Sequence, residues 1–303
     1  MTEFFGSLQG LGIETGTLLM FAMLLVLLVS GIPLAFVTLL VALIFALGWF
    51  GPMVVPLITS RVYSFVGSFV FVSVPMFVLM AAILDRSGIA RDLFDAMKLL
   101  GGRLRGGVAI QTIVVAVILA AMSGIIGGEV VLLGLVALPQ MLRLGYDKHL
   151  AIGVVCAGGA LGTMVPPSIV LIIYGLTANV SVGDLFTAAF LPGLMLAGFY
   201  VAYVLIRAYL NPAIAPVQDE EPVPMAEKLR LLKGLILPLT VVAGVLGSIY
   251  GGIASVTEAS AVGVAGVLLS TVVRGEFTLE LLKGAALQTL QTVGMIVWIG
   301  IGA

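Results

Sequence analysis

The chain has 303 residues, of which 61% are hydrophobic and only 10% charged, and this excludes a soluble globular protein because too few polar side chains remain to cover its surface. The net charge of −1 provides no basic surface for nucleic acid, and the single cysteine and single histidine exclude an internal disulfide and a histidine metal cluster. With a mean hydropathy of +1.26, most of the chain is predicted to lie in lipid.

Stretches without charged residues predict the membrane spans. Residues 15–60 contain no charged residue and are long enough for two crossings, with a break at Ser30-Gly31-Ile32-Pro33, where glycine and proline interrupt a helix. The other predicted spans are 62–84, 150–175, 185–208, 234–252, 253–273 and 285–303. The predicted fold class is therefore an all-α, polytopic membrane protein with about eight spanning helices, to which a helical hairpin is added below.

Residues 86–105 differ from the spans because charged residues alternate with apolar ones, a pattern that predicts an amphipathic helix lying along the membrane interface. Basic residues cluster here and again at 143–148, 207–233 and 274–283, whereas the turn at 177–184 contains none. The positive-inside rule places the basic clusters in the cytoplasm and that turn outside. The N-terminus is then expected on the outer, periplasmic side.

Residues 106–142 begin and end on the cytoplasmic side, yet these 37 residues are too few for two full crossings, which need roughly 40 apolar residues and a turn. Two short spans are one interpretation, and a re-entrant helical hairpin with its tip near 123–128 is the other. Unpaired backbone at such a tip is tolerated only where protein or a water-filled cavity receives it.

The next span is interrupted at 158–168 by three glycines, two prolines and two hydroxyl residues. Pro166 and Pro167 remove two backbone donors and disfavour helix in the residues before them, so carbonyl groups from Gly162 to Val165 lose their partners. A kink repaired by a side chain or a neighbouring helix is one interpretation. The density of interruptions favours the other, a broken helix that lines a site. Freed carbonyls suit a desolvated cation, and half-helix N-termini suit a substrate carboxylate.

Two acidic residues stand within or between apolar segments. Glu129 lies in the hairpin segment, where an ionised group is costly, so it is a functional candidate. The alternative is a tip residue that reaches water or a lysine. Glu258, between two predicted spans, is interpreted as an exposed acid in a turn on the outer surface.

Four segments carry a family resemblance: "PMFVLMAAILDRSGIARDLFDA" at 75–96, "ALPQMLRLGYDKHLAIG" at 137–153, "GALGTMVPPSIVLIIYG" at 159–175 and "VTEASAVG" at 256–263. With them, essentially the whole chain resembles the large membrane subunit of tripartite ATP-independent periplasmic (TRAP) transporters. The Pro-Pro-Ser motif with its preceding glycines is the most specific of these features, and the Thr-Glu-Ala motif is moderately specific.

The resemblance implies an elevator-type secondary transporter of the bacterial inner membrane, built from two inverted repeats. It makes residues 106–142 the inward re-entrant hairpin. It also implies Na⁺ as the coupling ion, a small four-helix membrane subunit as partner, and a periplasmic binding protein that delivers a small carboxylate substrate. No organic cofactor, enzymatic activity or nucleic-acid partner is expected.

Carried over residue by residue, the resemblance places a sodium site where the hairpin tip meets the broken helix. The implied ligands are Ser123, Gly162, Val165 and Pro167. The candidates for the substrate site are Gly124, Thr163, Pro166, Ser168 and Glu129. The family tip is commonly rich in Ser-Gly repeats, whereas this chain has Ile125 and Ile126 there, so position 125 offers only backbone oxygen.

The sequence stops at Ala303, inside the span that precedes the second hairpin of the family, so we expect the second repeat to be incomplete in this chain. The predicted organisation has five parts. They are scaffold spans with the interfacial arm (1–105), a transport core (106–184), a spanning helix (185–210), a cytoplasmic linker (211–233) and the start of the second repeat (234–303).

Other functions compete with sodium-coupled import. A proton-coupled carrier would use Glu129 as the titrating group, and a non-transporting scaffold subunit would only hold partner proteins. An intramembrane enzyme is disfavoured because the single histidine, His149, lies in a basic loop and no G-x-S-x-G motif occurs.

Overall fold

The computed structural model describes residues 10, 12–88, 93, 104–124, 128–216 and 225–302. Every regular element in these ranges is a helix, which confirms the predicted all-α class. The chain forms two compact units, Met1–Phe71 with Leu290–Ala303 and Val72–Thr289. The predicted interfacial helix at 86–105 and the centre of the predicted linker at 211–233 lie mostly outside the described residues.

The first unit begins with two packed apolar helices, α2 (Ile13–Val29) and α3 (Leu34–Phe50). Gly31 between them has a φ of 83°, and Pro33 directly precedes α3. The predicted break between the first two apolar segments is therefore confirmed. Glycine supplies the left-handed backbone conformation, and proline fits at a helix start because it has no amide to leave unpaired.

The core of the first unit is formed by Val37, Val41 and Phe45 of α3, which pack against apolar side chains of α2. The C-terminal end of α14 (Leu279–Gly302) also belongs to this unit, and the ring centroid of Trp298 lies 5.2 Å from that of Phe36. Apolar side chains also cover much of the unit's outer surface, as expected for helices that face lipid.

The predicted span at 62–84 was wrong at its start. After α3, a short η1 (Gly51–Met53) leads into α4 (Val54–Val66), which ends where the amide of Gly67 donates to the carbonyl of Tyr63 at 2.8 Å. The following apolar segment consists of η2 (Phe69–Val72) and α5 (Ser73–Arg86). The prediction followed charge-free stretches, and these do not reveal a helix end that a glycine marks.

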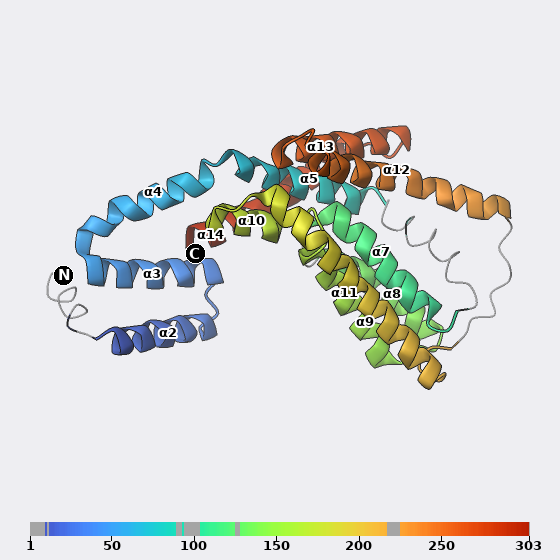
Figure 1. The fold of residues 1–303 in the computed structure, drawn as a ribbon, viewed down its shortest axis with the longest axis horizontal. Coiled ribbons are helices and arrows are strands. Elements are labelled where there is room, and N and C mark those ends of the chain that lie inside the picture. Colours follow the sequence, from blue (N-terminus) through green and yellow to red (C-terminus); the bar gives the residue numbers. More distant parts are fainter. Residues whose placement is uncertain are drawn as a thin grey trace. The chain divides into compact units, whose positions relative to one another are not determined.

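The second unit contains four helices that lie alongside one another (Figure 1). They are α7 (Gly107–Ser123), α8 (Gly128–Arg143), α9 (Lys148–Ala160) and α11 (Val182–Leu210). In the same unit α13 (Val256–Val273) packs against both α5 and α12 (Met225–Tyr250). The pair α7 and α8 corresponds to the predicted hairpin segment.

Alanine side chains form much of the interface between α7, α8 and α9. Five alanines of these helices have no exposed surface: Ala109, Ala116, Ala120, Ala137 and Ala151. Small residues let helix backbones approach closely, which is how helices associate in lipid, where no hydrophobic effect drives them together.

Hydrogen bonds connect the start of α7 and the turn between α8 and α9 to each other and to a distant segment. The amide of Val108 donates to the hydroxyl of Tyr146 at 3.3 Å, and the amide of Asp147 donates to the carbonyl of Ile214 at 2.8 Å. Asp147 also caps α9, because its carboxylate accepts hydrogen bonds from the amides of His149 and Leu150. This end of the α7–α8 pair is therefore tied to the start of α9 and to the segment after α11.

Five helical segments in the described part of the chain are long and apolar enough to cross a membrane. They are Leu34–Val66, Phe69–Arg86, Val182–Leu210, Val256–Val273 and Leu279–Gly302. Other apolar helices are shorter, including Ile13–Val29, Gly107–Ser123 and Ile169–Ala178. The chain is thus a polytopic membrane protein, and the number of eight spans stays a prediction.

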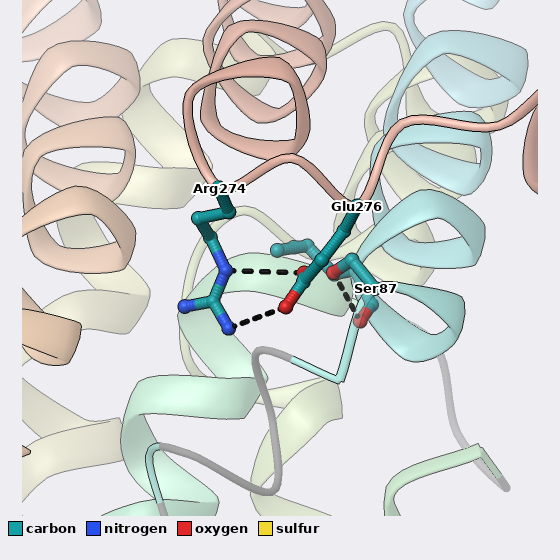
Figure 2. Close-up of polar contacts among 4 residues, drawn as sticks. Ser87, Arg274 and Glu276 are labelled. Atoms are coloured by element: carbon teal, nitrogen blue, oxygen red, sulfur yellow. Dashed lines mark hydrogen bonds and ion pairs between the residues drawn. The ribbon is translucent and has the colours of Figure 1, made fainter.

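A charged pair stabilises the turn between α13 and α14. The guanidinium of Arg274 donates two hydrogen bonds to the carboxylate of Glu276, at 3.1 and 3.0 Å (Figure 2). A pair joined by two hydrogen bonds fixes the turn more firmly than a single ionic contact.

Ser87, which follows α5, donates from its hydroxyl to the carbonyl of Leu84 at 3.0 Å.

Candidate functional site

The break in the Pro-Pro segment is present as predicted. Helix α9 ends at Ala160, η3 (Leu161–Thr163) adds one tight turn, and α10 (Ile169–Ala178) begins only after Ser168. The amides of Met164 and Val165 both donate to the carbonyl of Leu161 at 2.9 Å. The segment from 164 to 168 is therefore irregular backbone between two half-helices.

Four buried residues in this break have carbonyl groups that accept no hydrogen bond from the described part of the chain. They are Gly162, Val165, Pro166 and Pro167. Ser168 is fully buried and its hydroxyl donates to the carbonyl of Thr163 at 2.9 Å, so it pairs one further carbonyl of the break. Carbonyls without partners in buried surroundings cost free energy unless another group meets them. Of the two interpretations of the sequence, this favours an unrepaired break.

The tip of the hairpin contacts this break directly. Helix α7 ends at Ser123 and is followed by the cap residue Gly124, which has a φ of 59°. The carbonyl of Gly124 accepts a hydrogen bond from the amide of Ile169 at 3.2 Å. A Cβ atom added at Gly124 would overlap the carbonyl oxygen of Pro167. Only glycine therefore combines this backbone conformation with this close approach. Ile125 and Ile126 lie outside the described residues.

Glu129 stands in the first turn of α8 and is only 3% exposed. The hydroxyl of Ser123 donates to its Oε1, whereas Oε2 is buried and has no hydrogen-bond partner in the described part of the chain. A Cβ atom on Gly162 would lie 2.9 Å from Oε2 and 3.0 Å from Oε1. Glu129 therefore reaches neither solvent nor a described lysine, and its carboxylate lies against the broken helix.

The structure brings five of the predicted site residues together: Ser123, Gly124, Glu129, Gly162 and Pro167. The other four are adjacent in the break but differ in surroundings. Pro166 and Ser168 are buried, the side chain of Val165 packs in the core, and Thr163 donates from its hydroxyl back to the carbonyl of Ala160 at 2.8 Å. Their roles as ion or substrate ligands stay predictions.

Sequence reasoning missed Asp85 as part of this region. A cavity of about 10 Å³ is lined by Leu84, Asp85, Leu119, Met122, Ser123, Glu129 and Leu132. A Cβ atom on Gly128 would lie 3.5 Å from Oδ2 of Asp85, which places that carboxylate beside the start of α8. The available signal was an acidic residue that ends an apolar span, yet it was interpreted only as the boundary of the span.

Comparison with protein families gives a match over most of the chain. Residues 21–303 match the family described as tripartite ATP-independent periplasmic transporter, DctM component.

Curated relatives agree with this family match. The C4-dicarboxylate TRAP transporter large permease protein DctM of Vibrio cholerae is 33% identical over 80% of this chain and 53% of its own length. The ectoine/5-hydroxyectoine TRAP transporter large permease protein UehC of Ruegeria pomeroyi is 33% identical over 63% of this chain and 44% of its own length. The sialic acid TRAP transporter permease protein SiaT of Haemophilus influenzae is 28% identical over 78% of this chain and 38% of its own length. The chain spans about half the length of the first of these relatives.

Proposed function

The chain belongs to the DctM component family of tripartite ATP-independent periplasmic transporters, and on this basis we propose that it acts as the membrane permease of a sodium-coupled, binding-protein-dependent importer of small carboxylate solutes. The observation that supports this most strongly is the contact of the hairpin tip with a helix break whose buried residues Gly162, Val165, Pro166 and Pro167 have carbonyls without a hydrogen bond from the described part of the chain. Irregular backbone at membrane depth is tolerated where it lines a site, and such broken helices hold ions and substrates in transporters.

The residues present fit a small cation without a hydration shell. The carbonyl oxygens of Gly162, Val165 and Pro167 and the hydroxyl of Ser123 are the proposed ligands, because hard cations prefer oxygen. When bound, sodium supplies a positive charge that offsets the carbonyl dipoles. The protein then orders the hairpin tip against the start of α10, through the contact between Gly124 and Ile169.

The same arrangement suits a carboxylate substrate. The first amides of α10 form a helix N-terminus beside the tip, and helix N-termini attract anions. The proposed substrate-site residues lie beside this N-terminus. Thr163, Pro166 and Ser168 precede it in the chain, and Gly124 contacts it through the amide of Ile169. The relatives named for C4-dicarboxylates, ectoines and sialic acid differ in substrate, so they support the class of small organic solutes rather than one compound.

Transport on this proposal is a movement of the hairpin and the broken helix against a static frame. The ordered tip shifts the equilibrium between inward and outward states only by its differential stability in the two states. The proposed partners are a small four-helix membrane subunit and a periplasmic binding protein, and the proposed location is the bacterial inner membrane with the N-terminus in the periplasm.

The test is uptake into proteoliposomes that hold the complete permease and its small subunit, with the binding protein outside. A radiolabelled carboxylate bound by that protein should accumulate when a sodium gradient is applied and should not accumulate with potassium alone. Sodium-free accumulation driven by a pH gradient would instead support the proton-coupled carrier. No accumulation under any gradient, with the binding protein loaded, would support the scaffold subunit.

A further inference from the structure

Glu129 is an acidic residue to which the proposed sodium site assigns no role, although its carboxylate lies beside two of the proposed ligands. Its Oε1 accepts the hydrogen bond of a proposed ligand, Ser123, and its Oε2 lies 2.9 Å from where a Cβ atom on another, Gly162, would be. Both oxygens thus lie between the hairpin tip and the break.

The second oxygen of this carboxylate has no partner among the described residues, and the side chain is 3% exposed. An ionised carboxylate buried without a counter-charge costs several kcal/mol, more than a hydrogen bond from one serine returns. The position of Glu129 in the first turn of α8 helps, but a helix N-terminus contributes only about 0.5–1 kcal/mol. A positive group at Oε2 would therefore stabilise the ionised carboxylate.

No described basic side chain provides that charge. Arg86, the basic residue next to Asp85, donates from Nε to Oε1 of Gln288 at 3.3 Å. Asp85 lines the same small cavity as Glu129 and adds a second negative group. The surroundings of Glu129 therefore include a second carboxyl group and the backbone of Gly162, and oxygen donors of this kind suit a cation rather than an anion.

The space beside Glu129 away from these ligands is small. The cavity there measures about 10 Å³, about the space of one water-sized group, and it is lined by residues of α5, α7 and α8. A carboxylate substrate does not fit this cavity beside Glu129.

We propose that the carboxylate of Glu129 is a direct ligand of the coupling cation, so that the site at the hairpin tip is a charged carboxylate site rather than one of neutral carbonyls and a hydroxyl. This assignment rests on the proposed sodium coupling and replaces the expectation that Glu129 contacts substrate. A bound monovalent cation neutralises the buried carboxylate, and an empty site leaves the charge uncompensated. Closure of the tip over the break therefore requires the cation.

The test is cation-dependent protection of the break, measured on the complete subunit in lipid nanodiscs without substrate. Cys156 is exposed, so it is replaced by serine, and Met164→Cys places a reporter thiol in the break. Alkylation of this thiol is followed over a sodium series at constant ionic strength. In the background protein, sodium should slow alkylation.

Glu129→Gln should raise the half-protecting sodium concentration at least about tenfold, because the variant removes a ligand charge but keeps the shape. Glu129→Asp keeps the charge and should retain protection at a moderately higher sodium concentration, which separates loss of the ligand from loss of the fold. The matched control is Glu258→Gln. Glu258 also stands in the first turn of a helix, but it is exposed and bonded to Ser255, so its removal should leave the half-protecting concentration unchanged.

The outcomes separate this inference from the proposed function. Full protection of Glu129→Gln at the same sodium concentration as the background protein overturns the role of Glu129 and leaves the sodium site of carbonyls and hydroxyl intact. A background protein that sodium does not protect at any concentration contradicts sodium coupling itself.

Discussion

The amide of Ile169 donates a hydrogen bond to the carbonyl of Gly124 at 3.2 Å. Ile169 is the first residue of the half-helix α10, and Gly124 caps the end of α7 at the hairpin tip. A helix start leaves its first amides without intrahelical partners, so a carbonyl from another element can pair with one of them. This bond connects the two interruptions of regular helix at 124–128 and 161–168, and any separation of Gly124 from α10 has to break it.

Gly162→Ala tests the contact between the break and Glu129. The new methyl group would lie 2.9 Å from Oε2 of Glu129, so the carboxylate has to move. We expect the half-saturating sodium concentration for uptake to rise about tenfold, since displacing one charged ligand costs about 1.4 kcal/mol or more. The measurement is uptake in proteoliposomes against the sodium concentration.

Gly153→Ala is the matched control for this change. Gly153 lies in α9 before the break, and a Cβ atom there meets nothing within 4 Å. The control should keep the sodium dependence of the wild type. Equal sodium dependence of Gly162→Ala and Gly153→Ala would mean that contact with Glu129 does not matter for the ion.

Gly124→Ala tests the close approach of the hairpin tip to the break. Gly124 and Gly88 both have positive φ, at 59° and 69°, but only a Cβ atom at Gly124 meets backbone, the carbonyl of Pro167. Each substitution should lower the free energy of unfolding by about 1 kcal/mol through the left-handed conformation. Only Gly124→Ala should also abolish sodium-dependent uptake. Thermal unfolding and uptake of both variants check this, and retained uptake in Gly124→Ala would contradict the contact.

Ser255→Ala tests the capping box at the start of α13. The hydroxyl of Ser255 accepts from the amide of Glu258, and Oε2 of Glu258 accepts from the amide of Ser255 at 2.7 Å. Losing this pair should lower the free energy of unfolding by about 1 kcal/mol. Ser248→Ala is the comparison, because its hydroxyl only donates to a carbonyl of its own helix and should cost much less. Equal thermal stability of the two variants would argue against the cap.

Asp147 predicts a pH dependence at the start of α9. Backbone hydrogen bonding from Leu150, followed by the nearby His149, lowers the pKa of this exposed carboxyl from its ordinary value of 3.8. A lowered pKa in the folded state means that the carboxylate stabilises the fold fully above 3.8, and this is lost as the pH falls through the lower folded pKa. Asp147→Asn keeps a capping side chain but cannot titrate.

The difference in unfolding temperature between wild type and Asp147→Asn should therefore shrink as the pH is lowered below 3.8. A difference that stays constant over the acidic range would show that the carboxylate is not hydrogen-bonded in the folded protein.

Local sequence signals predicted the helix break and the two arms of the hairpin well. Two consecutive prolines cannot continue a helix, so the end of α9 before Pro166 follows from backbone chemistry alone. The start of α5 was harder, because Gly67 ends α4 without any charge nearby to mark it. For Glu258, the sequence interpretation saw an exposed acid in a turn. The acid is exposed, and its bonds to Ser255 explain why it is there.

Contacts between distant segments could not be predicted from the sequence. Nothing in the spacing of residues places Glu129 against Gly162, since that contact depends on how closely α8 and α9 pack. A Cβ atom added at Gly159 would overlap Val130, so this close packing rests on a small residue whose role appears only in three dimensions. Asp85 was overlooked for the same reason, because its place beside α8 comes from packing and not from a motif.

The most direct measurement is binding of radioactive sodium to the purified complete subunit, by scintillation proximity, in wild type and in Ser123→Ala. We expect saturable binding in the wild type that is lost or strongly weakened in Ser123→Ala and retained in Ser248→Ala, whose hydroxyl donates to the carbonyl of Val245 in its own helix α12. Saturable binding of equal strength in wild type and Ser123→Ala, or none in the wild type, would contradict a cation site between the hairpin tip and the broken helix.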